Sequence, residues 1–383
     1  MTAIDEAKLS NYEYVPSKNE QYIPGQAIVT VIIDCYYKLD LVKQSIQSVL
    51  NQDYHNVELL LIDNGAEDLV SDYILKVYEK DKNIALIKFN ENQFSWEDTQ
   101  KVVAVCWNSG VLHSKGEIIT HLNYDDMLSK NCCSRMTKLF VENNNCVTAG
   151  PVPVSIDIDG NINKEFSNAL KLSNRRPRYI DGKKLALDFI DNSPKRYFSA
   201  PGGILFIKKD VLIKYGGFDR YSDATQVIKL AVHGESGFDS EAKLFWRHHD
   251  SQLNKIAKAK GVIWCNALRY TVKNENIIDI WERLFTKEEV KLFRNYIKNQ
   301  NIESSISVTL ELLRQKNLIG FIASLKNIIK QCPSLFFYAI GFSLLEVLKM
   351  FYEKIFSSVR NICCLLYTSD AADDLLCVDL GGR

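Results

Sequence analysis

Short apolar runs alternate with amphipathic stretches along the chain from about residue 27 to residue 247. Four of the runs predict strands, and the first is β-branched and continuously apolar, as a strand buried on both faces should be. The four runs are AIVTVIID (Ala27–Asp34), VELLLID (Val57–Asp63), IALIKF (Ile84–Phe89) and EIITHLN (Glu117–Asn123). The stretches between them place apolar residues at helical spacing. This alternation predicts an α/β domain.

Polar side chains follow three of these predicted strands. Asp34 and Asp63 end the first and the second strand, and the run Asn123–Asp126 ends the fourth. Ligands of open α/β sheets bind at the carboxyl ends of the strands. We therefore expect these polar groups to meet in one crevice.

Later parts of the chain have a different pattern. Residues 147–197 are less regular, and strand-like segments follow at 197–209 and 243–249, with a helix near 223–232 between them. Beyond about residue 274 the pattern is that of long helices. The expected parts are an N-terminal extension (1–24), an α/β domain (25–273), a helical C-terminal region (274–362) and a tail (363–383).

The C-terminal region contains an uncharged run at 333–345 that is too short to span a bilayer. This run predicts either a buried helix or a helix that lies at a membrane surface, with Lys349 and Lys354 at the headgroups. Both readings stay open at the level of the sequence.

The last residues of the chain have an unusual sequence. The strings CLLYTSDAAD (364–373) and CVDLGGR (377–383) look like the conceptual translation of a transposase-based sequencing adapter. We therefore expect residues 363–383 to be an artefact and exclude them from the fold. The alternative is a natural, frayed tail.

Composition narrows the function classes. The 47 basic and 47 acidic side chains balance, so no strong field attracts nucleic acid. The ten cysteines are irregularly spaced and form no zinc-ligand pattern. The N-terminus is polar and lacks the apolar core of a secretory signal. These features favour a cytoplasmic protein with reduced thiols.

The segment VTVIIDCYYKLDLVKQSIQSVLNQDYHNVELLLIDNGAED (29–68) resembles the opening strand, helix and second strand of family 2 glycosyltransferases of the GT-A fold. In that family an aspartate at the end of the second strand holds the nucleoside, which implies this role for Asp63. Tyr36 lies where the family places an aromatic residue beside the base, and Asp34 stands where Pro or Thr is usual. Alternatively, Asp63 only caps the following turn.

The segment VVAVCWNSGVLHSKGEIITHLNYDD (102–126) looks like the family's next block. Asn108 matches an asparagine of the donor site, and Asp125 and Asp126 match its acidic pair. The resemblance implies that these acids bind Mn²⁺ or Mg²⁺ and that Asp125 also contacts the donor. Such a cation neutralises the charge that develops on the leaving nucleoside diphosphate.

Two positions in this block depart from the family pattern. Trp107 replaces the usual arginine, so any phosphate or base contact from that position is lost, and Lys101 is the expected substitute. Asn123 replaces the first acid of the D-x-D motif, which weakens the inference of a metal site.

The segment GGILFIKKDVLIKYGGFDRYSDATQVIKLAVHGE (202–235) is similar to the family's acceptor-side block. Asp223 and Gly234 have the expected spacing, although Ser222 replaces a glutamate. The resemblance implies that Asp223 is the general base that deprotonates the acceptor hydroxyl. The alternative is that Asp223 is the N-cap of its helix.

The segment LFWRHHDSQL (244–253) looks like the family motif that closes over the diphosphate. Arg247 matches the motif and is suited to a bidentate phosphate contact. His249 matches a histidine that reaches the metal or the phosphate in relatives, and a structural role at the end of a strand is the alternative.

These resemblances imply a GT-A domain with a mixed central sheet, followed by a helical C-terminal region. The expected activity is inverting, metal-dependent sugar transfer from a nucleotide-diphosphate donor, with UDP as the nucleotide. By analogy alone, the acceptor is a glycan or a lipid-linked glycan of surface polysaccharide synthesis, at the inner face of the plasma membrane. Two rivals are a binding protein that has lost catalysis and a sugar nucleotidyltransferase, which usually has a Gly-rich loop where this chain has DCYYKLD.

Overall fold

The structure is a computed structural model. It describes residues 2–19, 22–96, 98–163, 177–191, 204–220, 222–253, 255–256, 276–331 and parts of 336–349. The chain divides into two compact units, Met1–Leu253 with Trp264–Asn301, and Asn254–Ile263 with Ile302–Arg383. The boundaries expected at 25 and 274 therefore fall inside the first unit. The tail expected to be an artefact lies outside the described residues.

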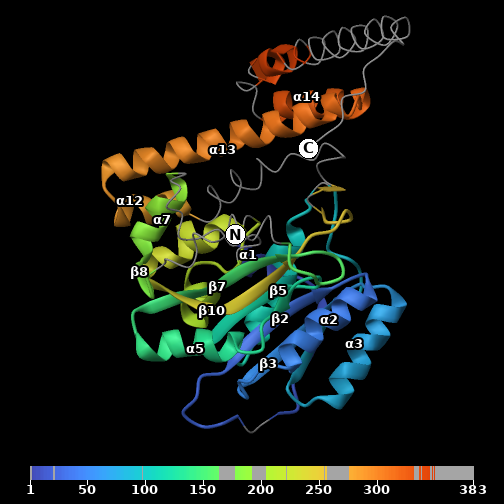
Figure 1. Cartoon of the computed structure of the whole chain (residues 1–383), viewed down its shortest axis with the longest axis vertical. Coiled ribbons are helices and arrows are strands. Elements are labelled where there is room, and N and C mark those ends of the chain that lie inside the picture. Colours follow the sequence, from blue (N-terminus) through green and yellow to red (C-terminus); the bar gives the residue numbers. More distant parts are fainter. Residues whose placement is uncertain are drawn as a thin grey trace, which may run out of the picture. The chain divides into compact units, whose positions relative to one another are not determined.

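The described residues of the first unit form a ten-stranded mixed sheet in the order β1-β4-β3-β2-β5-β9-β7-β10-β6, with β8 paired to β10 (Figure 1). Its strands are β1 (Tyr12–Val15), β2 (Val29–Cys35), β3 (Val57–Asn64), β4 (Ile84–Phe89), β5 (Ile118–Asn123), β6 (Met127–Leu128), β7 (Cys146–Ile156), β8 (Tyr179–Asp181), β9 (Phe206–Lys208) and β10 (Glu235–Arg247). Strands β2, β3, β4 and β5 pair in parallel, whereas β9 runs antiparallel to both β5 and β7. The expected α/β class with a mixed central sheet is confirmed.

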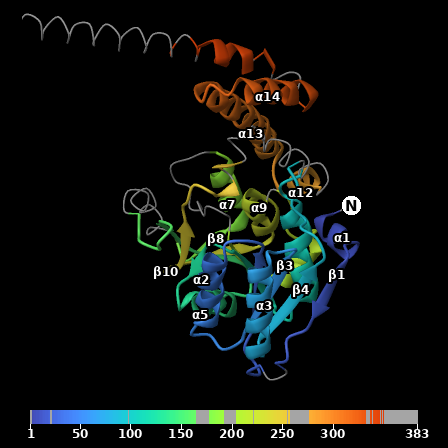
Figure 2. The ribbon, with the colours of Figure 1, turned by 90° about the vertical axis from the view of Figure 1, so that its right-hand side faces the viewer.

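Helices cover both faces of this sheet (Figure 2). One face packs on α2 (Leu39–Leu50), α3 (Asp68–Lys80) and α5 (Cys132–Glu142). The helical elements on the other face include α1 (Ala3–Lys8), η1 (Val103–Trp107), α4 (Asn108–His113), α7 (Gly182–Ile190), α8 (Lys209–Lys214), α9 (Ser222–Thr225), η3 (Gln226–Leu230), η4 (Ala231–His233) and α12 (Ile277–Leu284). Side chains alternate between the two faces, so Ile32 enters one core while Val31 and Ile33 enter the other.

The carboxyl end of β2 is the point where the strand order reverses. The chain proceeds from β2 to β3 and β4 on one side and then returns to place β5 on the other side of β2. In this register Asp34 lies opposite Asn123, and Cys35 lies opposite Asp63. Such switch points are where open α/β sheets bind ligands. The polar groups at these strand ends therefore surround one location, as we expected.

Strands β7 and β10 are longer than the sequence pattern indicated. They pair in parallel from Glu235 opposite Cys146 to Arg247 opposite Ile156, with an irregularity in β10 between Asp239 and Lys243. Pro151 pairs with Asp239 at this irregularity. Proline cannot donate to a sheet ladder and is tolerated at bulges, which explains why the prolines of β7 hid this strand in the sequence.

The N-terminal segment, expected to be an extension, is part of the first unit. Strand β1 pairs antiparallel with β4 at the edge of the sheet, and Ile4 of α1 packs into the core that also contains Trp107. The Arg220 guanidinium donates two hydrogen bonds to Glu6 of α1, at 2.8 and 2.9 Å. The N-terminal segment therefore stabilises the loop that precedes Asp223.

We expect Ile4→Ala to lower the free energy of unfolding by about 2–4 kcal/mol, because truncating a buried isoleucine leaves a cavity. Ile4 is 4% exposed, whereas Leu9, at the end of the same helix, is 78% exposed. Leu9→Ala is thus the matched control and should change stability by less than about 0.5 kcal/mol. Chemical denaturation measures both, and equal effects of the two changes would show that α1 does not pack on the sheet.

The second unit contains the end of α13 (Lys287–Arg314) and α14 (Leu318–Gln331). Thr309 and Ser324 hydrogen-bond between these two helices at 2.7 Å. Part of the uncharged run at 333–345 lies outside the described residues, and its described part is helical and exposes Phe337, Leu344 and Leu345. Within the described part of the chain, no helix combines the length and the apolar character needed to cross a membrane.

Candidate functional site

Asp126 lies beneath the surface at the turn after β5. Its Oδ1 accepts a hydrogen bond from the Arg247 backbone N–H at 2.9 Å, and its Oδ2 accepts one from the Asn123 amide at 2.9 Å. The side chain is 1% exposed, and burial together with the charge of Asp125 raises the pKa of Asp126 well above its usual range. Asp126 therefore joins the turn to β10, and its expected role as a metal ligand has no support in this geometry.

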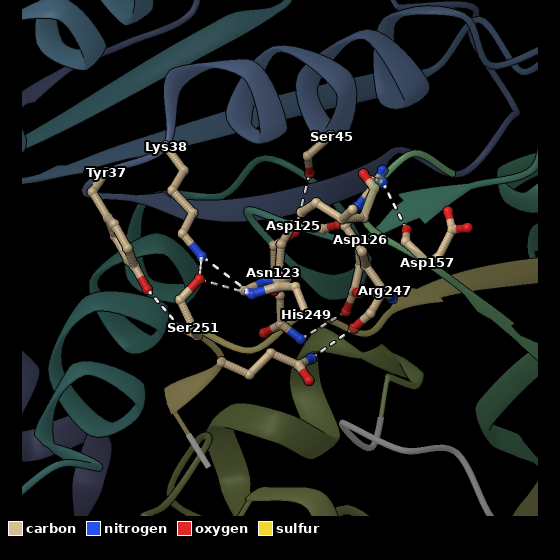
Figure 3. A network of polar contacts seen from close by, with 12 residues as sticks. Tyr37, Lys38, Ser45, Asn123, Asp125, Asp126, Asp157, Arg247, His249 and Ser251 are labelled. Carbon is tan, nitrogen blue, oxygen red and sulfur yellow. Dashed lines mark hydrogen bonds and ion pairs between the residues drawn. The ribbon is translucent and has the colours of Figure 1, made fainter. Parts of the chain in front are cut away.

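Asp125 and His249 face each other across the site (Figure 3). The Asp125 Oδ2 and the His249 Nε2 are 2.9 Å apart, and both side chains are largely buried. The expected segment at 243–249 thus brings His249 to the acidic turn, 124 residues away in sequence. This pair is the centre of the site.

Arg247 is turned inward and has no exposed surface. Its guanidinium has five N–H donors. Their partners are the carbonyl oxygens of Asp125, Asp157 and Ile158, the Gln44 Oε1 and the Met127 sulfur. The expected phosphate contact therefore needs correction, because the donors of Arg247 are used to hold three loops together.

Lys38 is a site residue that the sequence did not suggest. Its ammonium lies 3.2 Å from the His249 Nδ1 and donates to the Ser251 hydroxyl, and Figure 3 shows the three side chains pointing toward one another. Since an ammonium only donates, Nδ1 accepts, and the proton of His249 is on Nε2 and points to Asp125. A contact of Lys38 with the motif at 244–253 depends on tertiary structure and leaves no signal in sequence spacing.

The described residues contain no cluster of three or more Asp, Glu, His or Cys side chains placed to hold a metal ion. Asp125 and His249 nevertheless suit Mn²⁺ or Mg²⁺, which take one or two protein ligands and complete their shell with substrate phosphates and water. Ligation by the His249 Nε2 requires the other tautomer, with the proton on Nδ1 toward Ser251, 3.1 Å away. A cation at this site would therefore depend on the phosphates of a donor.

Asp63 and Tyr36 lie at the neighbouring strand ends. Asp63 is buried and accepts a hydrogen bond from the Ala66 N–H at 2.9 Å, which is the turn-capping contact of the alternative interpretation. Tyr36 is 39% exposed. A nucleoside contact of either residue stays a prediction.

Asp34 is paired with the residue that replaces the family's arginine. The Trp107 indole N–H donates to the Asp34 Oδ1 at 2.9 Å, and the Trp107 ring stacks on His121 with 3.7 Å between the centroids. Burial raises the pKa of Asp34, and the indole hydrogen bond partly offsets this shift. Trp107 therefore fixes Asp34 at the end of β2, and Asp34 is half-buried there.

Asn108 has a structural function in this geometry. Its amide donates to the carbonyl oxygens of Ala104 and Phe218, both at 2.7 Å, and its oxygen accepts the Phe218 N–H at 2.8 Å. These contacts fix the Gly-Gly-Phe-Asp turn, and the expected donor contact of Asn108 is corrected to this role. Lys101 lies half-buried one turn before Val105, and its phosphate contact stays a prediction.

Asp223 lies in the first turn of α9 with its side chain exposed. Protein packed around it and the charge of Asp219 raise the pKa of Asp223 to about 6. Asp219, in contrast, is buried and bound by Thr225 at 2.7 Å and by the Lys229 ammonium at 2.9 Å. Asp223 is thus the acid of this turn that solvent or a second substrate can reach, and it lies within the helix rather than at the N-cap.

Comparison with known proteins indicates which family part of this chain resembles. Residues 30–196 match the family described as Glycosyl transferase family 2. An uncharacterized glycosyltransferase of Haemophilus influenzae is 28% identical over 145 residues, which cover 38% of this chain and 54% of that protein. The Campylobacter jejuni GalNAc(5)-diNAcBac-PP-undecaprenol beta-1,3-glucosyltransferase is 25% identical over 144 residues, which cover 36% and 42% of the two chains.

Among solved structures, the mannosyltransferase PcManGT from Pyrobaculum calidifontis, in complex with GDP-Man and Mn²⁺, has a TM-score of 0.47 at 13% identity and covers 89% of this chain and 85% of its own. The chain spans about half the length of the Haemophilus relative, and less than half of the Campylobacter one. Residues 30–196 are therefore similar to family 2 glycosyltransferases, and the described strands of this range belong to the mixed α/β sheet.

Proposed function

We propose that the protein transfers a sugar, with inversion, from a nucleotide-diphosphate donor to a hydroxyl group of a glycan acceptor. The observation that carries the proposal is the Asp125–His249 pair at the switch point of the sheet, with Asp63 and Tyr36 at the adjacent strand ends. UDP is the proposed nucleotide, because Asp63 offers a carboxylate to the uracil N–H or the ribose hydroxyls.

The chemistry divides between two groups of residues. Asp223 takes the proton of the acceptor hydroxyl as its oxygen forms a bond to the anomeric carbon. The bond from that carbon to the donor phosphate breaks on the opposite side, and its electron pair leaves with the nucleoside diphosphate. Asp125 and His249 would hold a divalent cation, which would supply positive charge for this leaving group. Asp34 and Asp63 orient the donor so that the reacting atoms are aligned.

The acceptor and the location belong to the same proposal. The name of the Campylobacter jejuni relative contains an undecaprenol-linked saccharide, which supports a lipid-linked acceptor for this chain. The helical residues after 335 expose Phe337, Leu344 and Leu345, side chains suited to a membrane surface. We therefore propose that the protein works in polysaccharide synthesis at the cytoplasmic face of the membrane.

Incubation with a panel of nucleotide sugars, with and without Mn²⁺, tests the activity. We expect slow Mn²⁺-dependent release of UDP from one UDP-sugar, and faster release when the acceptor is present. Formation of pyrophosphate would instead identify a sugar nucleotidyltransferase. Nucleotide binding without turnover, for any acceptor offered, would identify a binding protein that has lost catalysis, consistent with the replacements at Asn123, Trp107 and Ser222.

A further inference from the structure

A diphosphate brings negative charge to a site that already contains the carboxylates of Asp125 and Asp34. Two positions from which the family resemblance would supply a cation do not supply one here. The guanidinium of Arg247 is buried, and its donors are bonded inside the protein. Trp107 is neutral and donates to Asp34. The positive charge for a diphosphate must therefore come from another residue or from a cation.

Lys38 is a basic residue whose side chain contacts the Asp125–His249 pair through His249. Its ammonium is 3.2 Å from the His249 Nδ1 and also donates to Ser251. An ammonium has three donors, and these contacts use two of them. Within the part of the chain that the structure describes, no hydrogen-bond acceptor contacts the third donor, and the ammonium lies 5.0 Å from the centroid of the Tyr37 ring. Lys38 can therefore donate to an additional anionic partner while it keeps its contact with Ser251. Its contact with Nδ1 is exchanged for that partner when His249 carries its proton on Nδ1.

The backbone of Lys38 is held in an uncommon conformation. Its φ of 61° and ψ of 63° lie in the left-handed region, which residues other than glycine rarely adopt. Lys38 directly precedes the first residue of α2, and this conformation turns its side chain toward Ser251 and His249 (Figure 3). Burial lowers the pKa of Lys38, and the charge of Asp125 opposes that shift. Strained residues of this kind concentrate at ligand sites.

We propose that Lys38 binds the diphosphate of the donor and supplies the positive charge that Arg247 and Trp107 do not. The inference rests on the proposed function, because it assumes a nucleoside diphosphate at this site. The Lys38 ammonium donates to a phosphate oxygen while His249 and Asp125 remain beside it. Lys38 thereby distinguishes a nucleoside diphosphate from a monophosphate, whose single phosphate lies nearer the ribose.

Titration calorimetry with UDP and UMP, in the presence of Mn²⁺, tests this role. Loss of one charged hydrogen bond in Lys38→Met should weaken UDP binding by roughly 10- to 100-fold. UMP affinity should change by less than about threefold, and Lys38→Arg should retain most of the UDP affinity. Lys43→Met is the matched control, because Lys43 is an exposed lysine of α2, the helix that Lys38 precedes, and pairs with Asp40 at 3.4 Å.

The outcomes separate the inference from the proposed function. If the parent protein binds UDP and Lys38→Met binds it within about threefold of the parent, Lys38 does not bind the diphosphate. Equal losses for UDP and UMP would also overturn the role, since they would indicate a general disturbance of the site. If the parent protein binds no nucleoside diphosphate, the proposed function fails, and the inference fails with it.

Discussion

Asp223→Asn is expected to lower kcat by roughly 10²- to 10⁴-fold, the usual contribution of general base catalysis. The amide cannot take the proton of the acceptor hydroxyl, and this loss is felt only in the transition state. Donor affinity should remain within about threefold of the parent, because the proposed role of Asp223 is toward the acceptor hydroxyl and not toward the donor. Steady-state kinetics and UDP titration on the same variant measure both quantities.

The dependence of activity on pH follows from the same residue. Its pKa is raised to about 6, so the carboxylate that accepts a proton is present above that pH and is lost as the pH falls through it. We expect kcat of the parent protein to decline below about pH 6. A raised pKa also means that the charged form disfavours folding at neutral pH, so Asp223→Asn should be at least as stable as the parent at pH 7.5.

Asp181→Asn is the matched control for Asp223→Asn. Asp181 is the N-cap of α7 and accepts a hydrogen bond from the Lys184 N–H at 2.9 Å, so the change replaces a helix-terminal carboxylate elsewhere in the same unit. Its turnover should equal that of the parent. Near-normal turnover of Asp223→Asn would remove Asp223 from the mechanism.

Asp125→Asn is expected to remove the dependence of UDP binding on Mn²⁺ and to weaken that binding by roughly 100-fold, or about 2.7 kcal/mol. Asparagine keeps the size of the side chain and can still hydrogen-bond to His249. The melting temperature should therefore change little. UDP titrations with and without Mn²⁺ provide the measurement, and Mn²⁺-dependent affinity equal to that of the parent would exclude Asp125 as a ligand.

Asp126→Asn should have the opposite pattern. In this variant an NH₂ group replaces one of the two carboxylate oxygens of Asp126. That group then faces either the Asn123 amide or the Arg247 N–H, both of which donate to Asp126 in the parent. A buried group left unsatisfied in this way costs about 1–3 kcal/mol of stability. Removal of the buried charge offsets part of this cost, because the pKa of Asp126 is raised. The effect of Mn²⁺ on UDP binding should be retained. Loss of that effect with unchanged stability would restore Asp126 as a metal ligand.

The strands at the centre of the sheet were predictable because burial on both faces leaves a continuous apolar run in the sequence. The run at 84–89 coincides with β4, and the run at 57–63 differs from β3 by one residue. Strand β1 has only four residues and is stabilised by pairing with β4, which is distant in the sequence. A short edge strand of this kind has no local pattern to identify it.

In the candidate site, too, some features could be predicted from the sequence and others could not. The order of motifs predicted that His249 and Asp125 belong to one site, and the two side chains are in contact. The inward orientation of Arg247 depends on the loop at Asp157–Ile158, whose carbonyl oxygens accept its hydrogen bonds. The position of Lys38 depends on a backbone conformation. Neither is encoded in the spacing of residue types, and both decide which side chains can contact a ligand.

A structure of the protein with UDP and Mn²⁺ bound is the most direct test of the proposed site. We expect the diphosphate to lie between Asp125 and Lys38, with Mn²⁺ in contact with Asp125 and the uracil beside Tyr36 and Asp63. Nucleotide bound away from the carboxyl ends of β2, β3 and β5, or a diphosphate that contacts neither Asp125 nor Lys38, would contradict the assignment of this site as the donor-binding centre.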